Sequence, residues 1–176
     1  GTQGVNAALR AGVDSIDHGS LLDRESMKLF RSSGAYLVPT LMPGHYLPLT
    51  METNPAFSAA IKAKARQASA AAKDSFRLAL DNDVNIAFGT DTGVTPHGDN
   101  AKEFALMVAQ GMPPAAAIRA ATVTAARLLG VERDLGTLEP ETYADLIAVR
   151  GEPLADITEL ERVDAVLKNG ELIFNR

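Results

Sequence analysis

Residues 84–91 read Val-Asn-Ile-Ala-Phe-Gly-Thr-Asp, and the alternating size of their side chains predicts a short buried strand. The bulky residues Val84, Ile86 and Phe88 fall on one face, because successive side chains of a strand point to opposite faces. The other face carries small residues and ends at Asp91. If the bulky face packs on helices and the small face lines an enclosed centre, as in a parallel α/β barrel, Asp91 lies where such folds keep their chemistry.

Helical and strand-like patterns alternate through the first part of the chain, which predicts an α/β fold. Capping side chains such as Asp23 and Asp99 precede several predicted helices, and glycines follow them. The predicted helices cover residues 2–11, 24–33, 55–80, 101–110 and two stretches within 113–129, the second capped by Thr122 or Thr124. The predicted strands cover residues 13–17, 35–38 and 84–91.

Residues 39–55 contain four prolines and Gly44, which predicts a long irregular loop directly after the second strand. Loops of that length in compact domains usually serve a function. His45 and Tyr46 lie in this segment. They either belong to an ordinary loop surface or recognise one end of a substrate.

The pattern changes near residue 131. Residues 144–149 are strand-like, and Asn169-Gly170 joins residues 163–167 and 172–174 in a predicted hairpin. The sequence therefore predicts an α/β part over residues 1–130 and a small β part over residues 131–176.

Composition excludes several classes of protein. The net charge is −5, and the basic residues are scattered, which argues against a nucleic-acid partner. No apolar run approaches the roughly 20 residues of a membrane span, and no signal segment opens the chain, so a cytoplasmic location is expected unless an upstream signal exists. Cysteine is absent, so a metal would be held by histidine and carboxylate.

The spacing of His18 and Asp91 fits one rim of a barrel. They are 73 positions apart, which is two slightly long units of a (β/α)8 barrel at about 31 residues each. A sheet of only three strands would leave both edges unpaired and half a barrel interior open. We therefore expect the chain to be the carboxyl-terminal portion of a longer protein.

All three histidines, at positions 18, 45 and 97, follow a strand or lie in the loop after one. A structural histidine is the alternative for His18, but its place at a strand end before Gly19 favours a metal ligand. Asp91 is either a turn residue or, beside a divalent metal, a general base. Such a metal lowers the pKa of water from 15.7 to about 7 and polarises a carbonyl. A catalytic zinc needs at least three protein ligands, so the others must lie outside this chain.

His97 follows Asp91 closely enough to overhang the same site. It is either an incidental solvent-facing side chain beside the helix cap Asp99, or a contact to the substrate.

Four spaced motifs lie along the chain: Asp17-His18-Gly19, Phe88-Gly89-Thr90-Asp91, Ala121-Thr122 with Ala125 to Gly130, and Gly136-Thr137-Leu138-Glu139 with Tyr143 to Leu146. Together they resemble the amidohydrolase superfamily, in the branch of imidazolonepropionase, prolidase-like (Xaa-Pro dipeptidase) and Xaa-Arg carboxypeptidase-like enzymes. The run from His97 to Lys102 is closest to the carboxypeptidase-like members. Glu141-Thr142 departs from the Gly-Lys that is frequent in the family, so we expect a strained or altered turn there.

The resemblance implies a distorted TIM barrel holding one or two zinc ions, with a small β-sandwich built from both chain ends. His18 would be the ligand at the end of the sixth strand, and Asp91 the ligand and general base at the end of the eighth. The family's paired histidines, bridging carboxylated lysine and fifth-strand histidine have no counterpart here. The remaining ligands are therefore expected outside this chain, and the fragment alone is expected to be inactive.

Three functional hypotheses follow. The first is a zinc-dependent dipeptidase or carboxypeptidase that cleaves amide C–N bonds of a small peptide, working as a homo-oligomer when full length. The second is a cyclic-amide hydrolase or a deaminase of the same superfamily. The third is a non-catalytic relic or interaction module that keeps the fold without the metal.

Overall fold

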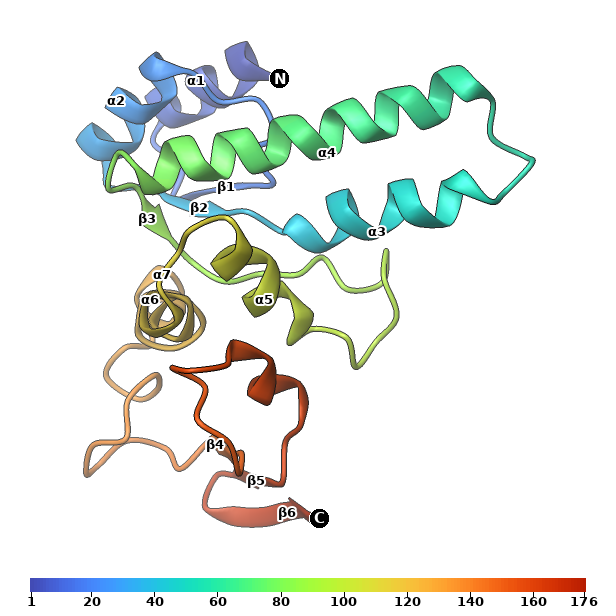
Figure 1. Ribbon diagram of the computed structural model, residues 1–176. Helices are drawn as coiled ribbons and strands as arrows, with labels where there is room; N and C mark the ends of the chain where they lie inside the picture. The colour runs from blue at the N-terminus through green and yellow to red at the C-terminus, as the bar shows by residue number, and fades with distance from the viewer.

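The computed structural model describes residues 1–176 and contains two separate three-stranded sheets (Figure 1). The first sheet is parallel, with the strand order β1 (Ser15–Asp17), β2 (Tyr36–Val38) and β3 (Asn85–Ile86). Helices separate these strands along the chain, as parallel pairing requires. The α/β class is thus confirmed, and each of the three predicted strands is present. The third is shorter than predicted, because β3 covers only Asn85–Ile86 of residues 84–91 and ends before Asp91.

The two faces of the parallel sheet differ as the sequence predicted. Ile16, Leu37 and Ile86 are aligned across the three strands, and the last two are almost fully buried. The neighbouring row contains Tyr36, which is half-buried, and Asn85, which is exposed. One face therefore packs in the core, and the other is open at Asn85 but buried at Ala87, which is 1% exposed.

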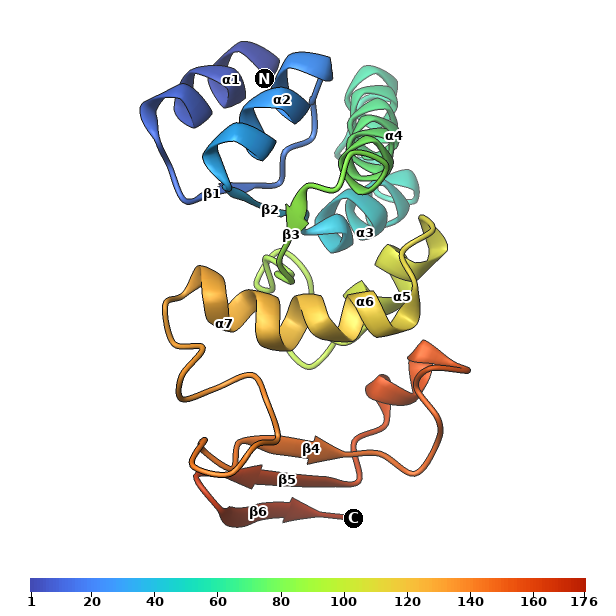
Figure 2. The ribbon, with the colours of Figure 1, turned by 90° about the vertical axis from the view of Figure 1, so that its left-hand side faces the viewer.

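The helices surround this sheet. In Figures 1 and 2, α1, α2 and α4 lie on one side of it, and the run from α6 to α7 lies on the other side, beyond β3. Their bounds are α1 (Thr2–Ala11), α2 (Arg24–Ser33), α3 (Leu41–Glu52), α4 (Ala59–Leu80), α5 (Lys102–Ala109), α6 (Pro114–Arg119) and α7 (Ala125–Leu128). None of them combines the length and hydropathy that a membrane crossing requires.

Large apolar side chains from distant parts of the chain form one core. Phe30 of α2, Phe76 of α4 and Met107 of α5 are each at most 1% exposed. They pack in the same cluster as Leu37 and Ile86 of the sheet. This packing makes the two strands and the flanking helices one cooperative unit.

The prediction of a loop over residues 39–55 is wrong, because α3 occupies most of that segment. Pro43 lies in the first turn, where a helix needs no backbone N–H donor. Pro48 removes one helical hydrogen bond, and the carbonyl that its ring crowds belongs to Gly44, which adapts most easily. The long helix α4 accordingly begins later than predicted, after Ser58, whose hydroxyl accepts from the N–H of Ile61.

A buried acid stabilises the start of α3. The two carboxylate oxygens of Glu103, on α5, accept from the backbone N–H groups of Leu41 and Met42, at 2.8 Å each. These are two of the donors that an isolated helix leaves without partners. The contact with Glu103, from a distant part of the chain, thus offsets the free-energy cost of the prolines in α3.

Two predicted helix caps are also wrong. A π-helical turn, Ala120–Thr124, joins α6 and α7 into one run, and neither Thr122 nor Thr124 starts a helix. The hydroxyl of Thr122 instead donates back to the carbonyl of Ile118 at 2.9 Å. Asp99 pairs its carboxylate with Lys102 and does not cap α5 through its side chain.

The second sheet is antiparallel and contains β4 (Leu146–Ala148), β5 (Ala165–Lys168) and β6 (Glu171–Asn175). A short 3₁₀ helix, Ile157–Glu161, precedes β5. Asn169 and Gly170 both have positive φ, 53° and 81°, which confirms the predicted hairpin turn.

Glu141 has a φ of 75°, so the strained turn expected there is present. The domain division near residue 131 stays a prediction.

Burial raises the pKa of Glu103 to about 7, although the N–H groups of Leu41 and Met42 act to lower it. A raised pKa means that the fold favours the protonated acid. This contribution to stability is complete below the ordinary value of 4.5 and is lost as pH rises through about 7. We expect it to lower the free energy of unfolding by roughly 2–3 kcal/mol between pH 5 and pH 8.

Denaturant unfolding across that pH range measures this effect. Glutamine in the Glu103→Gln variant keeps the size of the side chain but does not titrate. The free energy of unfolding should therefore change less steeply with pH in the variant than in the wild type, and this difference separates the effect of Glu103 from that of the histidines. Equal pH slopes would show that titration of Glu103 does not lower the stability.

Candidate active site

The parallel sheet brings three strand ends to one edge. His18 directly follows β1, and its N–H donates to the carbonyl of Val38 at the end of β2, at 2.8 Å. On the other side of β2, the N–H of Ala87 donates to the carbonyl of Leu37 at 3.0 Å. The pairing thus continues past the strands on both sides of β2. His18 and the segment that leads to Asp91 therefore emerge at the same edge.

A non-glycine residue in the left-handed backbone region follows each of the three strands. The φ angles are 68° at His18, 46° at Thr40 and 53° at Asp91. Such conformations cost on the order of 1–3 kcal/mol each and concentrate at functional sites. Two of them, at His18 and Thr40, lie within two residues of a strand end, which favours a functional role for this edge over a purely structural one.

Thr40 lies between the two predicted functional residues and contacts the first. Its Oγ1 is 2.6 Å from Nδ1 of His18. With the proton on Nδ1, the imidazole donates to Thr40 and leaves Nε2 as the nitrogen that can bind a metal. Metal-binding histidines normally engage their other nitrogen in this way. The contact therefore fits His18 as a ligand.

Glu103 fixes the backbone of the two residues that directly follow Thr40 and so restrains Thr40 itself. Thr40 is 9% exposed and immediately precedes the two N–H groups that bind the Glu103 carboxylate. The sequence pointed to neither residue. For Thr40, the available signal was its place after a predicted strand between those of His18 and Asp91. Glu103 has no such signal, because an acid in the first turn of a helix is commonplace.

The loop after β3 folds back over its own start. Thr90 Oγ1 lies 2.7 Å from Thr92 Oγ1, and the amide of Asn100 donates to Thr90 at 3.4 Å. Asp91 and His97 are both exposed in this loop. The ends of the loop are therefore tied together beside Asp91. A contact between His97 and a substrate stays a prediction.

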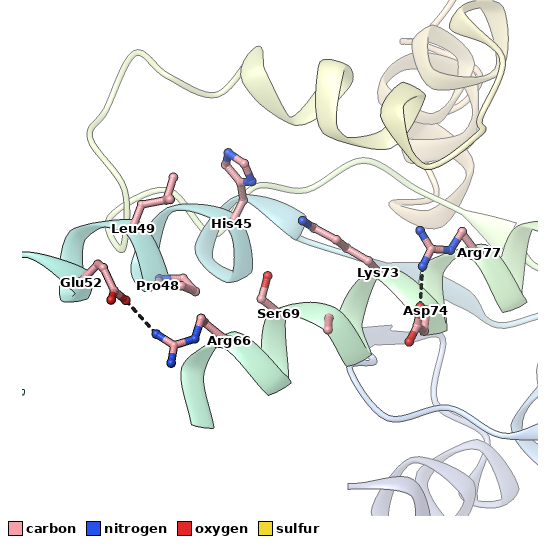
Figure 3. A pocket seen from close by; sticks show the side chains of 10 residues that line it. His45, Pro48, Leu49, Glu52, Arg66, Ser69, Lys73, Asp74 and Arg77 are labelled. Atoms are coloured by element: carbon pink, nitrogen blue, oxygen red, sulfur yellow. Dashed lines mark hydrogen bonds and ion pairs between the residues drawn. The ribbon is translucent and has the colours of Figure 1, made fainter. Parts of the chain in front are cut away.

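His45 and Tyr46 lie on α3, not in a loop. His45 lines a cavity of about 450 Å³ between α3 and α4, with Lys73 among its neighbours (Figure 3). Partial burial and, second, the charge of Lys73 lower the pKa of His45. The rings of Tyr46 and His45 are edge-on to each other, with 4.8 Å between their centres. The Lys102 ammonium lies 5.7 Å from the centre of the Tyr46 ring.

The cavity in Figure 3 is polar and carries paired charges. Arg66 pairs with Glu52, and Arg77 pairs with Asp74. His18 does not line this cavity, so the structure places His45 and His18 in different hollows. A role for His45 and Tyr46 in substrate binding stays a prediction.

No complete metal site lies within this chain. No group of three or more His, Cys, Asp or Glu side chains lies close enough together to hold an ion. His18 directly follows β1, and Asp91 lies in the loop after β3, five residues beyond Ile86; both types of donor suit zinc. The types of donor thus fit zinc, and a site shared by His18 and Asp91 stays a prediction.

Comparison with known proteins agrees with this geometry. The model of the amidohydrolase family matches residues 1–173. Among curated proteins, ochratoxinase from Aspergillus niger is 33% identical over 180 residues, which cover 98% of this chain and 36% of that enzyme.

Solved structures include two similar enzymes. A Xaa-Pro dipeptidase with methionine bound in its active site has a TM-score of 0.94 and 44% identity, covering 99% of this chain and 43% of that one. A putative prolidase from Bifidobacterium longum has a TM-score of 0.90 and 33% identity, covering 99% and 46%. The chain thus spans less than half the length of each relative. From the matched family model and these similarities, the chain belongs to the amidohydrolase family.

Proposed function

We propose that this chain forms the carboxyl-terminal part of a metal-dependent hydrolase of amide or peptide C–N bonds. In this proposal β1, β2 and β3 are the sixth to eighth strands of a distorted TIM barrel, and the open face of the sheet lines the barrel interior. The observation that carries the proposal is the sheet edge at which His18, Thr40 and Asp91 follow three adjacent parallel strands.

His18 and Asp91 would hold one or two zinc ions together with ligands outside this chain. When bound, the metal lowers the pKa of water and polarises the carbonyl group of the substrate. His18 would contribute Nε2, with its ring held by Thr40 at 2.6 Å. The position of the ring would then be set by the fold and not by the metal alone.

Asp91 would move the proton in the reaction. Its carboxylate would accept a proton from the attacking water and later give it to the leaving nitrogen. The exposed position of Asp91 in the loop after β3 leaves the carboxylate accessible to both groups. Tying of the loop to Thr90 would keep the backbone of Asp91 in place during both transfers.

The substrate we propose is a dipeptide or a short peptide. Two of the similar structures are a Xaa-Pro dipeptidase and a putative prolidase, which supports this class over cyclic amides and deamination substrates.

Asp91→Asn tests the role of the carboxylate. The amide has nearly the same size but does not accept a proton at neutral pH. In the full-length protein we expect hydrolysis of dipeptides to fall by at least about 100-fold, with an unchanged melting temperature. Turnover of a dipeptide panel and a thermal melt measure the two quantities.

The chain offers a matched control for this variant. Asp83 precedes β3, as Asp91 follows it, and both are exposed with nearly equal φ angles, 54° and 53°. Asp83→Asn should leave hydrolysis unchanged. The role of Asp91 is refuted if both variants retain turnover, or if both lose it equally.

Thr40→Val tests the positioning of His18. Valine keeps the branched shape but removes the hydroxyl that contacts Nδ1, so we expect zinc affinity of the full-length protein to fall about 10–100-fold. Thr40→Ser restores the hydroxyl and should recover most of the affinity. Competition with a chelator measures the affinity. Equal affinity in the wild type and the valine variant would show that the contact does not position the ligand.

A further inference from the structure

A second cavity lies between α3 and α4, and His18 forms part of its wall. It has a volume of about 250 Å³ and also contacts Thr40. The cavity is therefore adjacent to the imidazole that the proposed function assigns to the metal. A group bound there would lie directly beside the reacting part of a substrate.

Small and apolar side chains form most of the remaining wall. Ala65, Ala68 and Ala72 follow the helical period along one stripe of α4, and Leu47 and Met51 face them from α3. No Asp, Glu, Lys or Arg lines the cavity. Its size results from the three alanines, because larger side chains at that stripe would fill it.

The two helices approach closely and separate this cavity from the charged one in Figure 3. A side-chain carbon built on Gly44 would lie 3.8 Å from Cα of Ser69, which is ordinary packing distance. Pro48 and Ser69 contribute to both cavities and form their common wall. One helix pair thus presents an apolar hollow beside His18 and a charged hollow away from it.

We propose that the apolar cavity receives one uncharged, apolar side chain of the substrate, from a residue that flanks the scissile bond. This inference rests on the proposed function. Pockets that hold a whole small ligand have volumes of about 300–1,000 Å³, so a cavity of about 250 Å³ suits a single side chain. An apolar side chain gains by leaving water there, whereas a charged one loses hydration and finds no opposite charge.

Ala68→Leu in the full-length protein tests this inference, because leucine at the centre of the stripe would fill the cavity. Ala70→Leu is the matched control. Both alanines are exposed on the same helix, but Ala70 lines only the charged cavity of Figure 3. The substrates are two dipeptide series, Xaa-Gly and Gly-Xaa, in which Xaa is Ala, Leu, Phe, Lys or Asp.

We expect the wild type to prefer Leu and Phe over Lys and Asp in one of the two series. Ala68→Leu should lower kcat/KM for the Leu and Phe substrates by about 10–200-fold, the range that small changes in an apolar pocket produce. For the Ala substrate, kcat/KM should change by less than about threefold. Ala70→Leu should leave kcat/KM unchanged for every substrate. An equal loss for all substrates, or no loss, overturns the inference.

A binding measurement separates this inference from the proposed function. If the wild type hydrolyses neither series, the cavity is judged by NMR of the His18 ring, one of only three histidines. N-acetyl-leucinamide should shift that signal, N-acetyl-aspartate amide should not, and Ala68→Leu should abolish the shift. No shift, or the same shift with both compounds, overturns the inference.

Discussion

The in-register parallel pairing of β1, β2 and β3 is the constraint on which the rest of this structure depends. Parallel strands present all their carboxyl ends at one edge. The segments that follow the strands therefore leave the sheet on the same side, even though they are far apart in the sequence. His18 and Asp91 lie on opposite sides of the strand that ends before Thr40. A slip of one residue in either pairing would move Leu37 or Ile86 out of the core, so burial of the sheet also fixes the geometry of the edge.

The sequence was sufficient where local chemistry decides the structure. Strand-like patterns located all three parallel strands, although only Asn85–Ile86 of the predicted residues 84–91 form one. The positive φ angles of Asn169 and Gly170 match the turn that their types demand. The same reasoning failed for α3, because prolines predict a loop only when nothing else stabilises the helix. Glu103 lies about 60 positions away and provides that stabilisation, and no local pattern reveals such a contact.

The candidate site shows a similar division. The sequence correctly placed His18 at a strand end, because strand ends can be located from hydrophobic patterns. It placed Asp91 at the end of a strand too, but β3 ends at Ile86 and Asp91 lies in the loop that follows. The left-handed backbone at both residues and the intervening role of Thr40 depend on how the three strand ends pack together. The role of His45 was tied to a loop that does not exist, and its place on α3 puts it in the charged cavity.

The last strand of the second sheet has a consequence for handling the molecule. All residues of β6 are exposed, and Leu172, Ile173 and Phe174 are between 44% and 62% accessible. Its outer edge offers backbone donors and acceptors beside apolar side chains, which is the usual template for adding a strand from another polypeptide. Concentrated solutions of this chain will therefore tend toward edge-to-edge association, and a partner strand or a charged substitution at Ile173 would improve solubility.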